Sequence, residues 1–183
     1  MKDQNFIVKQ LKKTIPFLVY QEINNENIFV VSKDTLYFSL NFLKLHIGLQ
    51  YKILSCVSGV DFLTTNYRFS VVYDLLSLTY NSRLRVKVFI NEINSLPSIV
   101  DIFVNSNWWE REIWDLYGIY FDKHPDLRRI LTDYGFEGHP MRKDFPLSGY
   151  IEVRYDDNKK RIVVEPLELT QELRHFTFES PWL

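Results

Sequence analysis

The residues best suited to acid–base chemistry in this chain are Glu110, Glu112 and Asp115, which lie within six positions of one another. On a helix, Glu112 and Asp115 are three residues apart and are neighbours, and paired carboxyls can have separated pKa values suited to acid–base catalysis. Cations that could instead neutralise these acids are Arg111, Arg128, Arg129, Arg142 and Lys143. Bidentate pairing between arginine and carboxylate therefore favours structural ion pairs over catalysis.

Two histidines, His124 and His139, are each followed by proline and then by basic residues. Together with a carboxylate they could bind a metal ion, as in a small metal-assisted hydrolase. The available carboxylates are Asp126, Asp133 and Asp144. A separation of 15 residues is diagnostic of no metal, so we expect both histidines to be hydrogen-bonded structural residues. We expect His175 at a surface or an interface.

Basic residues at positions 128, 129, 142 and 143 alternate with Tyr134, Phe136 and Phe145, a mixture that can bind RNA or phosphate. Acids at 126, 133, 137 and 144 interrupt the series and would repel a polyanion. The formal net charge of -1 also gives no reason to expect a nucleic acid or an anionic membrane as the partner. An RNA-binding module is thus the weaker alternative, and contacts with protein are favoured.

Composition narrows the possible chemistry further. The chain has one cysteine, Cys56, which excludes an internal disulfide and any cluster held by cysteines of this chain alone. Glycine-rich phosphate loops, G-x-S-x-G, H-E-x-x-H and C-x-x-C are all absent. No run approaches the ~18 apolar residues of a membrane span, and no targeting segment is evident, so we expect any membrane association to be indirect. The complete lack of alanine indicates an A/T-rich genome, such as that of an organelle.

Hydrophobic periodicity predicts an α+β fold, with an antiparallel or mixed sheet and helices on one face. We expect helices over residues 4–19 and over 34–47, with Ser32 or Asp34 as N-cap and an end near Gly48. Strands are expected over residues 28–31, 53–62, 69–78 and 84–90, the last three joined as hairpins by polar turns. Leu96-Pro97 is predicted to open a further helix that runs to Tyr117 and stops at Gly118.

After residue 120 the chain becomes rich in proline, arginine and aromatic residues. Residues that precede proline avoid the α region, so both His-Pro pairs predict extended or turning chain. Residues 151–165 alternate about a polar turn and predict a hairpin. We therefore expect a compact α+β domain over residues 1–120 and an extended C-terminal docking arm with a hairpin over residues 121–183.

The second half of the sequence resembles a known family. The resemblance is carried by Glu110-Arg111-Glu112, Trp114 to Gly118, His124 to Pro140, Arg142 to Gly149, Tyr150 to Asp157, Glu165-Pro166 and Ser180-Pro181-Trp182. These segments are similar to the signature of the thirty-kilodalton-type core subunit of respiratory complex I. The one departure is Met141, where the family pattern has Phe or Leu. The residues that we assign to the signature or an interface are Glu110, Arg111, Glu112, Asp115, Gly118, His124, Pro125, Arg128, Arg129, Gly138, His139, Pro140, Arg142, Lys143 and Asp144.

The resemblance implies a non-catalytic subunit in the quinone module of the peripheral arm of NADH:ubiquinone oxidoreductase. It implies no cofactor on this chain, with FMN and iron–sulfur clusters on neighbouring subunits. It further implies partners among the other peripheral-arm subunits, chiefly the larger quinone-module subunit, and no nucleic acid. The implied location is the matrix side of the mitochondrial inner membrane, for an organelle-encoded protein.

Overall fold

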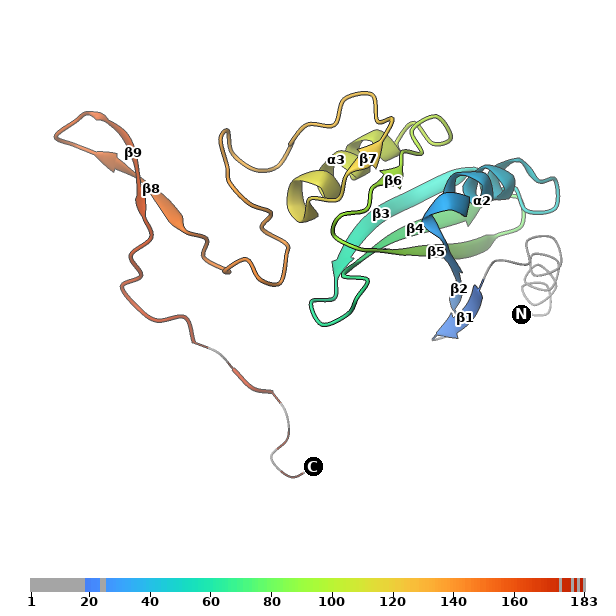
Figure 1. Cartoon of the computed structure of the whole chain (residues 1–183), viewed down its shortest axis with the longest axis horizontal. Helices are drawn as coiled ribbons and strands as arrows, with labels where there is room; N and C mark the ends of the chain where they lie inside the picture. Colours follow the sequence, from blue (N-terminus) through green and yellow to red (C-terminus); the bar gives the residue numbers. More distant parts are fainter. Residues whose placement is uncertain (1–18, 24–25, 175, 179, 181, 183) are drawn as a thin grey trace. The chain divides into compact units, whose positions relative to one another are not determined.

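The computed structural model describes residues 19–23, 26–174, 176–178, 180 and 182 (Figure 1). Apart from Val19, the helix predicted over residues 4–19 lies outside the described residues, and so does His175. The chain divides into two units, Met1–Phe145 and Pro146–Leu183. The domain boundary expected near residue 120 falls within the first unit.

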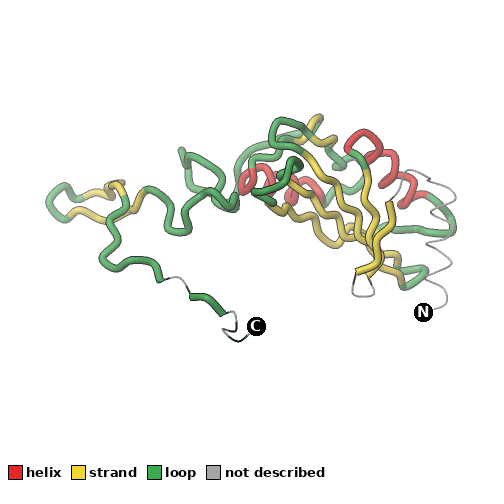
Figure 2. The backbone as a smooth tube through the Cα atoms, turned by 60° about the horizontal axis from the view of Figure 1, so that its bottom comes forward, coloured by secondary structure: helices red, strands yellow, loops and turns green. Residues whose placement is uncertain are grey.

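The first unit is built on a mixed five-stranded sheet, whose strands lie side by side in Figure 2. The strand order is β1-β2-β5-β4-β3. The strands are β1 (Val19–Ile23), β2 (Glu26–Val31), β3 (Ile53–Asp61), β4 (Phe69–Ser77) and β5 (Ser82–Ile90). Only β2 and β5 pair in parallel, and the other neighbours are antiparallel. The predicted mixed sheet and its two hairpins are confirmed.

The alternation of apolar and polar residues along the strands indicates which face of the sheet is covered. In β5, Leu84, Val86, Val88 and Ile90 are all buried, and the residues between them face the other way. β4 is central, between β3 and β5, and only two of its nine residues, Asp74 and Leu76, are partly exposed. The two helices α2 (Lys33–Leu45) and α3 (Ser106–Tyr117) contribute Leu36, Leu40, Leu43 and Ile113 to the same hydrophobic core as the covered face.

Helix α2 matches the prediction at its start and ends slightly early. Ser32 is the N-cap residue, and the helix stops at Leu45 with His46 as C-cap. The predicted end near Gly48 is therefore too late, and Ile47, expected on the buried face, is 81% exposed. The apolar stripe that anchors the helix ends at Leu43, so nothing in the core requires another turn.

The helix predicted from Leu96-Pro97 is wrong over its first ten residues. Leu96–Pro97 forms the short strand β6, which pairs in parallel with β7 (Phe121–Asp122). The main-chain N–H groups of Leu96 and Ser98 donate to the carbonyls of Tyr120 and Asp122. Pro97 has no N–H to donate, so it fits between these two bonds as well as it fits a helix start. In the segment after Pro97, Ile99, Ile102 and Phe103 recur at helical spacing and are buried in the hydrophobic core.

The second unit contains an antiparallel hairpin of β8 (Ile151–Asp156) and β9 (Arg161–Pro166). The four residues between the strands, 157–160, form the polar turn. The hairpin inferred from alternation is confirmed, and its two strands are labelled in Figure 1.

Candidate functional site

Helix α3 directs two signature acids into the interior of the first unit. Glu110 is fully buried, and its Oε1 accepts the N–H of Ile99 at 2.9 Å. Its Oε2 accepts the hydroxyl of Ser98 at 2.6 Å and lies 3.8 Å from Nε2 of His124. Burial raises the pKa of Glu110 to about 6, although these hydrogen bonds act to lower it. Through these hydrogen bonds, Glu110 links the segment that follows β6 to helix α3.

Asp115, one and a half turns further along α3, is also fully buried. Its Oδ2 accepts three successive main-chain N–H groups, from Ile130, Leu131 and Thr132, at 3.2, 2.8 and 2.9 Å. Its Oδ1 accepts the Thr132 hydroxyl at 2.6 Å and pairs with Arg129 at 3.3 Å. Burial acts to raise the pKa of Asp115, but these donors outweigh it and lower the pKa overall. Asp115 thus shapes the loop from residue 129 to 132 around one carboxylate.

The two histidines bind main-chain carbonyls of α3 at well-separated points. Nε2 of His124 lies 3.2 Å from the carbonyl of Asn107, and its Nδ1 accepts the N–H of Asp126, which assigns the proton to Nε2. Nδ1 of His139 lies 2.9 Å from the carbonyl of Asp115. Burial lowers the pKa of His139, and the nearby Arg142 lowers it further. The predicted hydrogen-bonded role is confirmed for both.

These carbonyl partners are eight residues apart on α3, about 12 Å along the helix axis. The alternative of a metal site that uses both histidines therefore finds no support in their placement. Among the described residues, no group of three or more His, Cys, Asp or Glu side chains is positioned to hold a metal ion.

Gly118 is the point at which the loop after α3 must turn back over the helix. It has a φ of +75°, in the left-handed region that glycine adopts without strain, and it caps the helix as predicted. A Cβ atom at this position would lie 2.6 Å from Nε2 of His139 and 2.7 Å from Nη2 of Arg142. Gly118 therefore provides both the turn and the space for two signature side chains.

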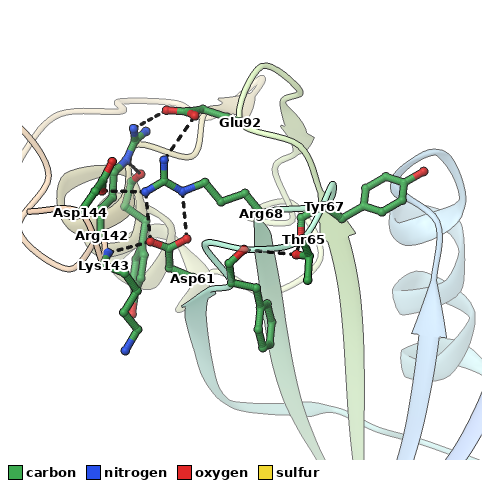
Figure 3. A network of polar contacts seen from close by, with 10 residues as sticks. Asp61, Thr65, Tyr67, Arg68, Glu92, Arg142, Lys143 and Asp144 are labelled. Carbon is green, nitrogen blue, oxygen red and sulfur yellow. Dashed lines mark hydrogen bonds and ion pairs between the residues drawn. The ribbon is translucent and has the colours of Figure 1, made fainter.

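A third buried acid, Asp61 at the end of β3, anchors the far end of the same loop (Figure 3). Oδ1 of Asp61 lies 2.9 Å from Nε of Arg68, and Oδ2 accepts the N–H of Lys143 at 2.7 Å. Burial acts to raise the pKa of Asp61, but bonds from Arg68 and Lys143 and the arginine charge lower it overall. Arg68 also binds Asp144, with Nη2 and Oδ1 2.7 Å apart.

Arg142 completes this network. Its Nε donates to the carbonyl of Tyr117 at 2.7 Å, and its Nη1 pairs with Glu92. Arg68 lies 3.4 Å from the same glutamate, so two arginines and three acids form one connected cluster. The cluster joins the hairpin turn after β3, the segment after β5 and the loop after α3, three segments far apart in the sequence.

The remaining signature residues are held less deeply. Arg111 donates to the carbonyl of Arg128 at 3.2 Å and lies over the ring of Trp108, 5.2 Å from its centroid. Arg128 pairs with Asp126 at the surface, and Glu112 is half-buried on α3. Gly138, at a φ of +94°, offers its carbonyl to Arg129 at 2.9 Å, while a Cβ there would lie 2.9 Å from the Phe145 ring. Pro125 is exposed and Pro140 half-buried.

Of the three α3 acids Glu110, Glu112 and Asp115, only Asp115 pairs with one of the predicted cations, Arg129, while Arg128 pairs with Asp126. Arg142 pairs with Glu92 instead, and Lys143 contributes its main-chain N–H. Asp61, Arg68 and Glu92 were missed because they lie before residue 100, outside the recognised signature. The signal for Asp61 was an acid at an inward-facing position of an alternating strand, which requires a buried cation or donor.

The family assignment follows from a match to a family model. The model described as respiratory-chain NADH dehydrogenase, 30 Kd subunit, matches residues 29–151. The chain belongs to this family. The 30 kDa subunit is part of NADH:ubiquinone oxidoreductase, so the resemblance inferred from Glu110 onward is confirmed, and the chain is a subunit of respiratory complex I that associates with other subunits.

Curated relatives match this member of the 30 kDa family over nearly its whole length. It is 51% identical over 183 residues to NADH dehydrogenase (ubiquinone) iron-sulfur protein 3 of Arabidopsis thaliana. This match covers 98% of this chain and 96% of the relative. It is 53% identical over 176 residues to NADH-ubiquinone oxidoreductase subunit 9 of Reclinomonas americana, covering 96% and 85%. The match extends to the half of the sequence before residue 100.

Among solved structures, a chain of the membrane-bound sulfane sulfur reductase, an archaeal respiratory membrane complex, has a similar fold. The TM-score is 0.69 at 22% identity, over 79% of this chain and 86% of that chain. At this identity the likeness concerns the fold alone. Within the described residues, neither helix is long and apolar enough to cross a membrane.

Proposed function

We propose that this chain is a non-catalytic scaffold subunit in the quinone module of the peripheral arm of proton-pumping NADH:ubiquinone oxidoreductase. The observation that carries the proposal is the use of the three buried acids. Glu110, Asp115 and Asp61 each accept hydrogen bonds on both carboxylate oxygens from donors of their own chain. A carboxylate engaged in this way positions main chain, whereas a catalytic acid or base needs an oxygen that can reach a substrate proton.

The loop held by these acids presents a surface suited to protein contact. Its exposed side chains include large apolar and aromatic residues, Tyr120, Leu131, Tyr134 and Met141, and Trp108 of α3 is exposed as well. Arg111 lies over the ring of Trp108, 5.2 Å from its centroid. Tryptophan, tyrosine and arginine dominate the energetics of protein interfaces. We infer that residues 121–183 supply the docking surface, and that the principal partner is the larger subunit of the quinone module.

We further propose that FMN and the iron–sulfur clusters are bound by neighbouring subunits. The plant relatives are called iron-sulfur proteins, but iron–sulfur clusters are held chiefly by several cysteine thiolates and this chain has one cysteine. Burial raises the pKa of the Cys56 thiol, and its hydrogen bond to Asp74 raises it further. Both effects keep the sulfur protonated, which disfavours metal binding. The proposed location is the matrix side of the mitochondrial inner membrane, consistent with an A/T-rich coding bias.

Two measurements test this function. In a native separation of membrane complexes, the chain should co-migrate with NADH dehydrogenase activity in stoichiometric amount. The isolated chain should contain less than stoichiometric iron, acid-labile sulfide and flavin. Failure to co-migrate refutes membership of the assembled enzyme, and stoichiometric cofactor on the isolated chain refutes the scaffold role.

A further inference from the structure

The hairpin of β8 and β9 separates apolar from charged side chains between its two faces. The strand register pairs Val153 with Val164 and Tyr155 with Ile162, so alternate positions share a face. One face, here called the hairpin face, consists of Ile151, Val153, Tyr155, Ile162, Val164 and Pro166. The opposite face consists of Glu152, Arg154, Asp156, Arg161, Val163 and Glu165. On that side Arg154 and Glu165 form two hydrogen bonds of 2.7 Å.

The hairpin face is apolar yet open to solvent within the described residues. The five Ile, Val and Tyr side chains of the hairpin face are between 53% and 67% exposed. A two-stranded ribbon with no cover is marginally stable in water, because it buries too little apolar surface to offset the entropy of ordering its chain. A face with this composition is stabilised when another apolar surface covers it.

We propose that the hairpin face docks onto an apolar surface of a neighbouring subunit, with the charged face left in water. This inference rests on the proposed function and deepens it, because it assigns one face of one element as an interface. Docking removes the apolar side chains from water, and the Arg154–Glu165 pair keeps the other face soluble.

The size of the hairpin face indicates a neighbouring subunit rather than a second copy of this chain. Two strands of six residues make a ribbon about 20 Å long and two strands wide, which offers on the order of 300 Å². One partner of a stable interface contributes roughly 800 Å². The hairpin face is too small to hold a dimer by itself, but it suits one segment of a longer contact made by the rest of the chain.

The turn of the hairpin indicates the charge of the partner at that end. Residues 156–161 contain three bases and two acids. Asp156 is buried and directed inward, where its Oδ1 accepts the N–H groups of Asn158 and Lys159 at 2.9 and 3.4 Å. Lys159 pairs with Asp156 at 3.9 Å, and Lys160 and Arg161 are exposed beside Asp157, which leaves the turn with a small excess of positive charge. The partner surface that fits is apolar, with carboxylates along the rim that meets the turn.

Adjacent valines of β9 provide a matched test. Val164 is on the hairpin face and Val163 on the charged face, so Val164→Asp and Val163→Asp make the same chemical change one residue apart. Each tagged full-length chain is expressed in cells that lack their own copy, and its retention on the captured complex is measured. We expect Val164→Asp to lower retention by about tenfold or more, since a carboxylate would be buried against an apolar surface. Val163→Asp should change retention by less than about twofold.

Equal retention of the two variants, or retention of Val164→Asp at the wild-type level, overturns the hairpin inference alone. Failure of the wild-type chain to co-purify overturns the proposed function instead. Thermal unfolding of the isolated chain gives a second readout, and it should be the same for both variants. A loss of stability in Val164→Asp but not in Val163→Asp would mean that another part of the same chain covers the hairpin face, and it would refute the inference. Binding of the wild-type chain, but not Val164→Asp, to phosphatidylcholine–phosphatidylglycerol vesicles would refute it in favour of a membrane.

Discussion

The loop between α3 and Phe145 and the segment from Pro146 onward have similar compositions but are stabilised in different ways. The loop has little regular structure, yet Asp115 accepts main-chain N–H groups in its middle and Asp61 accepts one near its end. The later segment forms a regular hairpin whose apolar side chains remain exposed. A segment without regular secondary structure can therefore be held in place by a few buried carboxylates. A segment with regular secondary structure can still have an uncovered apolar face that needs a partner. Four predictions test this contrast, from the largest expected effect to the smallest.

Replacement of Asp115 should have the largest effect. Asp115→Ala leaves three main-chain N–H groups in the loop without their acceptor and Arg129 without its carboxylate, so it should lower the free energy of unfolding by about 3–5 kcal/mol. Urea unfolding measures the loss, and trypsin cleavage after Arg128 and Arg129 should become faster. The control is Asp126→Ala, at an exposed surface pair, which should leave both readouts unchanged. Equal effects of the two variants would contradict a special role for the buried acid.

Gly118→Ala should have the second largest effect. It adds a side chain at a φ of +75° and within 2.6 Å of the His139 ring, so the free energy of unfolding should fall by about 3 kcal/mol. Gly135→Ala is a matched control, because its φ is +70° but no atom lies within 4 Å of the new Cβ. It should cost about 1 kcal/mol, from backbone strain alone. If both variants lose the same stability in urea unfolding, close packing of the loop over α3 is not what requires Gly118.

The pH dependence of stability should depend on Glu110. Its pKa is raised from 4.5 to about 6, chiefly by burial, so between these values the folded chain keeps a proton that the unfolded chain has released. The contribution of Glu110 to stability therefore falls as the pH rises through this window, by about 2 kcal/mol in total. Asp61 and Asp115 have lowered pKa values, so their contributions are lost only as the pH falls below their ordinary value of 3.8.

Glu110→Gln tests this assignment. The amide oxygen can still accept the N–H of Ile99, and the amide N–H₂ can donate to the Ser98 hydroxyl, but the side chain no longer titrates. In urea unfolding between pH 4.5 and 6.5, stability should fall with rising pH by about 2 kcal/mol more in the wild-type chain than in Glu110→Gln, while the opposite contribution of His139, whose pKa is lowered, is common to both. An unchanged slope in Glu110→Gln would assign the titration to another group.

The smallest effect is expected in the hairpin. Arg154→Gln removes a two-bond pair with Glu165 that is exposed on both sides, so the unfolding midpoint of the isolated chain should not change detectably. Arg68→Gln removes a similar two-bond pair with the buried Asp61 and should lower the midpoint clearly. A comparable loss in both variants would mean that the two regions do not differ in the way described above.

Much of this fold could be predicted because its elements have local signals. Alternation in β5 and the hydrophobic stripe of α2 each identify an element without reference to the rest of the chain. The exception was Leu96-Pro97, since whether proline begins a helix or lies at a strand edge depends on the carbonyls supplied by Tyr120 and Asp122. Local sequence does not contain that partner.

The candidate site was predicted in its residue types and only partly in its contacts. Asp115 and Arg129 were both named as candidates for an ion pair, but the sequence did not say which acid would meet which base, and the structure pairs them. Arg142 had several acids within reach along the chain, but the fold offers it Glu92, fifty residues earlier. Pairings across such separations are decided by the sheet that brings the segments together, so no spacing rule within the signature could select them.

The parallel pairing of β2 with β5 has a consequence for the order in which the first unit forms. Strands β3, β4 and β5 are joined by short turns and can associate through contacts that are close in sequence. Strand β2 must instead wait for β5, since its partner residues, such as Val31 and Val88, are separated by α2 and two strands. During synthesis the β1–β2 ribbon therefore emerges first but joins the sheet late. Until β5 has left the ribosome, the edge of β2 that will pair with it is unpaired, and a chaperone or another chain can bind there.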